Sequence, residues 1–132
     1  SSTRTFASAQ FSMPEGWNGS TVAFSVSWFA SSGTAQSNVR WCMDAVSIAS
    51  GTSFLTVMGS SQCVTSTYKA ANQLAYSSLS PSITIGNNAA PGDLVFWRFF
   101  RDDGNGRDLL DSFAKMVNVD IWYKRTKFSD DP

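Results

Sequence analysis

The amino-acid sequence predicts an all-β protein, an antiparallel β-sandwich whose expected form is a jelly roll. Two observations support this prediction. About seven or eight short segments favour strands, and turn residues separate them at intervals of roughly 8–15 positions. No segment repeats apolar residues at the spacing of a long helix. The 132 residues are enough for one domain. We expect that domain to span residues 1–124, followed by a flexible charged tail at 125–132.

The strands are expected in the following order along the chain. A first strand ends at Phe11, and a turn containing Pro14 and Gly16 follows it. The clearest alternation comes next, because every second residue from Val22 to Trp28 is apolar and the residues between them are small or polar. Related patterns predict further strands at 39–45, 62–68, 82–85, 91–101 and 116–123.

The strand expected at 91–101 is apolar on both faces. Its first face carries Val95, Trp97 and Phe99, and its second carries Leu94, Phe96 and Phe100, with Arg98 among them. One face of an antiparallel sheet commonly meets water and is then polar at every second position. Two interpretations remain open: the chain covers both faces itself, or the second face contacts a partner chain.

The closing strand adds to this candidate interface. Its alternation places Val117, Val119, Ile121 and Tyr123 inside, and Met116, Asn118, Asp120 and Trp122 outside. Desolvated aromatic side chains dominate many protein contacts, so the outward Trp122 favours such a contact. The chain is expected to form a homo-oligomer, a trimer, through an interface that contains Leu94, Phe96, Phe100, Met116 and Trp122.

The tryptophans allow a different interpretation. Alternation places Trp28, Trp41 and Trp97 inside, which leaves Trp17 at a turn and Trp122 on an outward face. Exposed Trp side chains stack on sugars in carbohydrate-binding sandwiches, so Trp17 and Trp122 are the candidate glycan contacts. The competing interpretation is that both pack against loops or a neighbouring subunit.

Composition and charge exclude several classes of function. The net charge is zero, whereas nucleic-acid and anionic-membrane partners require a basic field, and no apolar run is long enough to span a membrane. Residues 1–92 contain few charges, namely Arg4, Glu15, Arg40, Asp44 and Lys69. A surface rich in Ser, Thr and Asn fits a protein held in a larger assembly or a durable extracellular one.

Catalysis and cofactor binding are not expected. The chain contains no His, which excludes Ser-His-Asp and Cys-His arrangements. The carboxylates at 102–108 resemble a calcium loop only superficially, because the twelfth-position Glu is missing and Arg107 interrupts the ligands, so a hairpin loop is the interpretation. Cys42 and Cys63 form either a disulfide between neighbouring strands or two packed thiols.

Four segments resemble a group of small virion-associated proteins of tailed bacteriophages, many of them marine. The most specific piece is Met13-Pro14 followed by Trp17-Asn18 within the segment 11–22, which leads into the aromatic strand ending at Trp28. The other segments are the Ser-rich stretch 79–85, the Pro-Gly-Asp strand 91–102 and the closing strand 117–123. The resemblance covers about residues 6–124. Many members of that group carry a longer N-terminal segment than this chain.

This resemblance implies a non-catalytic virion component. The expected role is an oligomeric capsid decoration or cementing protein, or part of a fibre, with partners that include further copies of itself and the major capsid protein or another virion protein. The positions of Phe96 and Phe100 are often polar in that group, which singles these two residues out as contacts specific to this chain. The alternative is a carbohydrate-binding module that recognises a host-surface glycan.

Overall fold

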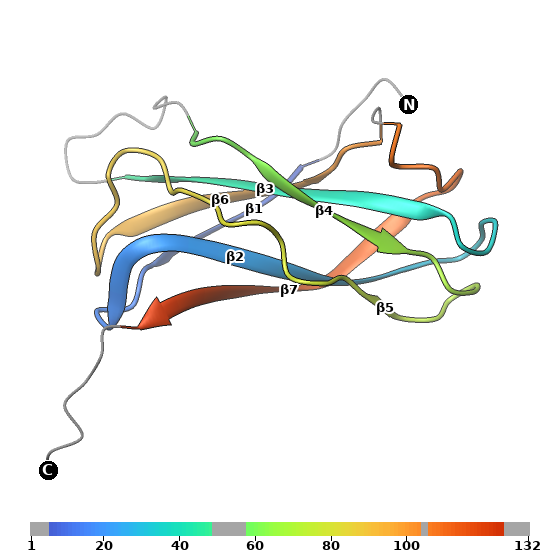
Figure 1. Ribbon diagram of the computed structural model, residues 1–132, viewed down its shortest axis with the longest axis horizontal. Helices are drawn as coiled ribbons and strands as arrows, with labels where there is room; N and C mark the ends of the chain where they lie inside the picture. Colours follow the sequence, from blue (N-terminus) through green and yellow to red (C-terminus); the bar gives the residue numbers. More distant parts are fainter. Residues whose placement is uncertain (1–5, 49–57, 104–105, 126–132) are drawn as a thin grey trace, which may run out of the picture.

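The computed structural model describes residues 6–48, 58–103 and 106–125 and places them in two antiparallel sheets packed face to face (Figure 1). The first sheet contains, in spatial order, β1 (Phe6–Ser12), β6 (Leu94–Arg101), β3 (Asn38–Ser47) and β4 (Gln62–Thr67). The second contains β5 (Ala75–Tyr76), β2 (Trp17–Ala30) and β7 (Ala114–Arg125). The predicted antiparallel β-sandwich is confirmed.

Details of the expected topology differ. The segment 82–85 forms no regular strand and makes a single bridge from Ile83 to Val22, with Gly86 bridging Val46. The described strands lie in sheets of four and three, which does not establish the eight-strand jelly roll, so that finer form stays a prediction. Strand β7 extends to Arg125, and the tail expected to be flexible lies, from residue 126 on, outside the described residues.

The core fills the space between the inner faces of the two sheets. Strand β2 contributes the alternating residues from Val22 to Trp28, all of them buried, as its pattern predicts. The Trp28 ring meets Trp41 of β3 edge to face, with 5.9 Å between ring centroids. The buried Ser66 accepts a 2.8 Å hydrogen bond from the indole N–H of Trp28, so this buried donor has a partner.

Strand β6 lies inside its sheet, between β1 and β3. Its inner face, Val95, Trp97 and Phe99, belongs to the core. Both neighbours are antiparallel, and the register places Cys42 of β3 opposite Phe100 and Asp44 opposite Arg98. Its outer face changes in exposure along the strand: Leu94 is exposed, Phe96 is half-buried and Phe100 is buried.

A disulfide joins the first sheet's β3 to its edge strand β4. Cys42 and Cys63 are directly opposite each other in the antiparallel register, and their sulfur atoms are bonded. The disulfide is therefore the correct one of the two alternatives that the sequence left open. It closes a loop of 21 residues and so restricts the unfolded chain.

The Ser-rich segment 77–83 runs beside β2 and bonds with it through side chains as well as backbone. The hydroxyls of Ser77 and Ser80 accept hydrogen bonds from the backbone N–H groups of Val26 and Phe24, at 2.9 and 3.0 Å. The backbone N–H groups of the same two serines donate to the carbonyls of Val26 and Phe24. The hydroxyls thus replace strand partners, and this edge of β2 is covered without a regular strand.

The Pro-Gly-Asp sequence before β6 forms a turn that ties three strands together. Gly92 has a φ of +84°, and an added Cβ would lie 2.3 Å from a carboxylate oxygen of Glu15. The carboxylate of Asp93 accepts hydrogen bonds from the Ala90 N–H and from the hydroxyl of Ser47 at the end of β3. The positive φ of Gly92 is therefore the main reason for glycine at this position, because the exposed Glu15 side chain can move aside.

At the other end of β6, a buried ion pair holds the chain that leads to β7. The carboxylate of Asp108 accepts hydrogen bonds from Arg101 Nε at 2.9 Å, from Arg101 Nη2 at 2.6 Å and from the backbone N–H of Arg40. Arg101 also donates to the carbonyls of Leu110 and Ser112. Both charges are thus surrounded by partners, as a buried pair requires.

Replacing Asp108 by Ala should lower the free energy of unfolding by about 3–5 kcal/mol, because the Arg101 charge stays buried without its counterion. Urea unfolding monitored by Trp fluorescence measures this change. The exposed Asp111→Ala variant is the control and should change stability by less than about 0.5 kcal/mol. Equal stability of the two variants would show that the pair does not hold the fold.

Candidate interaction surface

The predicted interface residues do not form one patch. Leu94, Phe96 and Phe100 lie on the outer face of the four-stranded sheet, whereas Trp122 lies on the outer face of the three-stranded sheet. Leu94 is 40% exposed and Phe96 is half-buried, but Phe100 is only 6% exposed. Phe100 therefore offers little surface to a partner, and it contacts the guanidinium of Arg98, which lies 5.8 Å from its ring centroid.

The placement of Met116 and Val117 by alternation is wrong. The β2–β7 register shifts by one residue between the pairs Ser27–Asn118 and Trp28–Met116, so β7 contains a bulge at this point. Beyond the bulge the alternation is reversed, which turns Met116 toward the core and leaves Val117 56% exposed. Val119 and Ile121 face inward as predicted. Met116 is consequently not an outward contact.

Of the two interpretations of Trp17 that the sequence left open, the structure agrees with packing and not with a glycan contact. Its side chain is 1% exposed and belongs to the core cluster. The turn after Pro14 brings its backbone N–H to the Pro14 carbonyl, and it is paired with Arg125 at the far end of β7. Trp17 therefore begins a long strand instead of standing in a solvated turn, and its buried ring cannot stack on a glycan.

Trp122 has the exposed position that its sequence predicts. Its side chain is 55% exposed, and its indole N–H donates a 3.1 Å hydrogen bond to the hydroxyl of Ser25 on β2. Asp120 lies opposite Ser25, and Asn118 donates to the carboxylate of Asp120. The outer face of β7 thus presents one oriented aromatic ring among short polar side chains.

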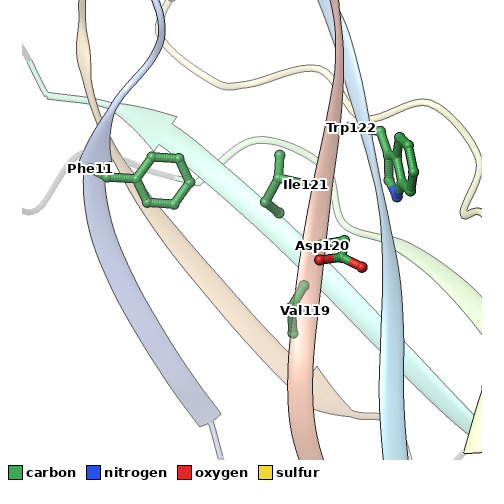
Figure 2. Close-up of a pocket in the computed structure, with 5 residues that line it drawn as sticks. All are labelled: Phe11, Val119, Asp120, Ile121 and Trp122. Carbon is green, nitrogen blue, oxygen red and sulfur yellow. The ribbon is translucent and has the colours of Figure 1, made fainter.

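A shallow groove separates the edge strands β1 and β7, which belong to different sheets (Figure 2). Phe11 on β1 and Val119 and Ile121 on β7 point toward each other across it, while Asp120 and Trp122 point to the other side of β7. The Phe11 ring stacks on Trp97, with 4.9 Å between ring centroids, and is 40% exposed. The groove is therefore apolar on its inner side and open to solvent.

Both strands along this groove have a bare edge. Among the described strands, β1 pairs with β6 alone and β7 pairs with β2 alone. β7 is 12 residues long and carries the exposed apolar side chains Val117, Trp122 and Tyr123. Unpaired backbone groups beside apolar side chains favour the addition of another strand, so proteins usually protect such an edge.

The Arg98–Asp44 ion pair on the outer face of the four-stranded sheet links two strands of that sheet. Arg98 donates from Nε to Asp44 at 2.9 Å and from Nη2 at 2.5 Å, and the Asp44 side chain is almost fully buried. The hydrogen bonds to Asp44 raise the pKa of Arg98, against the opposing effect of partial burial. This pair joins β3 to β6 and is engaged within the fold.

The acidic loop after β6 offers little to a metal ion. Asp108 is bound to Arg101, and the carboxylate of Asp102 lies 3.4 Å from Arg40 Nε. Residues 104 and 105 lie outside the described residues. Cys42, Cys63 and Asp102 come close together, but the two sulfurs are bonded to each other and so cannot act as thiolate ligands.

Sequence reasoning did not find the groove. Phe11 marked only the end of the first strand, and Val119, Ile121 and Tyr123 were placed inside, although the Tyr123 side chain is 39% exposed. The signal that was missing is the strand order, because only the pairing of strands shows which of them lie at an edge. The sequence features that could have indicated an exposed edge strand here are the length of the last apolar segment and its outward Trp122.

No known protein family, curated protein or solved structure matches this chain. Within the described residues there is also no helix of the length and hydropathy needed to cross a membrane. Function is therefore inferred from the residues and their geometry.

Phe100 and Leu94, both on the outer face of β6, should differ in how much they stabilise the fold. Phe100→Ala should lower the free energy of unfolding by about 3–5 kcal/mol, because it leaves a cavity beside Cys42. Leu94→Ala should cost about 1 kcal/mol or less, because that side chain is partly solvated. Thermal unfolding followed by circular dichroism tests both. A stable but dissociated Phe100→Ala variant would instead support the interface role predicted from sequence.

Proposed function

We propose that this chain is a non-catalytic structural protein of a bacteriophage virion, which self-associates as a capsid decoration or cementing protein or as part of a fibre. The observation that carries self-association is the 12-residue strand β7, one edge of which no described strand covers, with its exposed Val117, Trp122 and Tyr123. The virion role rests on the sequence resemblance described above. The major capsid protein or another virion protein is the proposed further partner.

Two features support a durable particle component. The disulfide between β3 and β4 is typical of proteins that act outside a reducing cytoplasm, virion surfaces included. The surface formed by residues 1–92 relies on Ser, Thr and Asn with few charges, which suits a subunit held among neighbours. The expected trimer has lost part of its support, because Phe100 and Met116 are packed within the fold.

The test is the protein content of purified phage particles that encode this sequence. Mass spectrometry should detect the chain in gradient-purified virions in many copies, and gold-labelled antibodies should mark either the capsid surface or the tail fibres. Particles free of the protein would refute the proposal. A label confined to fibres would exclude the decoration role.

A second function, glycan recognition, is favoured by one observation. Trp122 is held by its hydrogen bond to Ser25 and is flanked by Asp120 and Asn118 on the same outer face. A rigid exposed ring beside hydrogen-bonding groups is what a sugar face requires. Because Trp17 is buried, this site would contain Trp122 without the second tryptophan expected from sequence.

A glycan array tests this alternative, with the Trp122→Ala variant as the paired sample. Binding that weakens by about tenfold or more in the variant would support recognition through the Trp122 ring. The Tyr76→Ala variant is the control, because Tyr76 is exposed on β5 at the opposite edge of the same sheet. A blank array for the wild-type chain would remove the alternative.

A further inference from the structure

We propose that β7 pairs with β7 of a second copy, antiparallel about a two-fold axis at Trp122, so that the two three-stranded sheets become one continuous sheet. This inference deepens the proposed function, on which it rests, by naming the subunit contact. The first support is the bare edge itself: β7 is paired on one side by β2, and no other described strand covers its second side. The occupant is a second copy of this chain.

The bulge limits which part of β7 can pair. It lies at Val117, where the regular alternation of the strand is interrupted. From Asn118 to Tyr123 the β2–β7 register is unbroken, and it shifts again between Tyr123 and Arg125, so Trp122 lies within the regular stretch, near its end. An antiparallel contact between two copies must be symmetric about one residue pair, because a two-fold axis makes the interface identical on both sides.

Charge selects the register. When the axis passes through Trp122, Asp120 lies directly opposite the partner's Lys124, and this attractive pair occurs twice. An axis at Asp120 places that carboxylate opposite the partner's Asp120, and an axis at Lys124 places two ammonium groups opposite each other. Opposite charges stabilise directly facing cross-strand positions and like charges destabilise them. Of the possible axis positions from Asp120 to Lys124, only the axis at Trp122 places these opposite charges face to face.

Side-chain direction agrees with this register. Directly opposite residues of an antiparallel pair point to the same face, so the two Trp122 rings meet on the outer face together with both charge pairs. On the inner face, Ile121 lies opposite the partner's Tyr123, beside the groove that Phe11 lines (Figure 2). The contact therefore covers the exposed rings of Trp122 and Tyr123 and the apolar side of the groove.

Charge reversal tests the register. Asp120→Lys and Lys124→Asp should each weaken dimerisation by about tenfold or more, because each creates two like-charge pairs, and the double variant should restore the wild-type affinity within about threefold. Sedimentation velocity over a dilution series measures the dissociation constants. Both side chains are exposed, so the fold, checked by circular dichroism, should not change. A double variant no tighter than the single ones would overturn the proposed register.

Crosslinking tests the axis independently. Trp122→Cys should form a covalent dimer on mild oxidation, because the two new thiols face each other. Asn118→Cys is the matched control on the same strand face; its copies would lie about 27 Å apart in this register and should stay uncrosslinked. Equal crosslinking of both variants, or none for Trp122→Cys at the highest soluble concentration, would overturn the inference. Oligomerisation that is unchanged in all of these variants would also overturn the inference. The proposed function is tested separately, by the presence of the chain in virions.

Discussion

The packing of aromatic inner faces between the two sheets is the constraint on which the rest of the structure depends. Trp41 and Trp97 can both be buried against the second sheet only if β3 and β6 keep their register, because a slip of one residue would turn a ring to solvent. That register fixes which residues of β6 face outward. Across the sandwich, the pairing of β2 with β7 likewise fixes Trp122 on the surface.

The sequence was sufficient where side-chain period alone decides the outcome. Along β2 and the first part of β3, residues that alternate in hydrophobicity also alternate in burial, because successive side chains of a strand point to opposite faces. The exposure of Trp122 follows from the same rule. Local period could not reveal the bulge in β7, which depends on how β2 opposes it, and so Met116 and Val117 exchanged faces.

Non-local pairing explains the other differences. Trp17 follows a turn and so looked solvated, but its strand partner is Arg125 at the other end of the chain. On the apolar outer face of β6, Phe100 is buried beside Cys42, whereas Leu94 and Phe96 keep some exposure, a difference that the sequence of the strand alone does not reveal. Strand order is set by contacts between distant segments, and no single segment contains that information.

The hydroxyls of Ser77 and Ser80 have a consequence for growth of the sheet. They occupy backbone N–H groups of β2 on the side away from β7, and Pro81 has no N–H to offer a further strand. The two edges of the three-stranded sheet therefore differ: the Ser-rich segment blocks the addition of a strand on its side, whereas β7 still offers unpaired backbone groups among the described strands. If β7 pairs with a second copy as proposed, growth of this sheet therefore ends after that one addition, because both ends of the joined sheet are then formed by the Ser-rich segments.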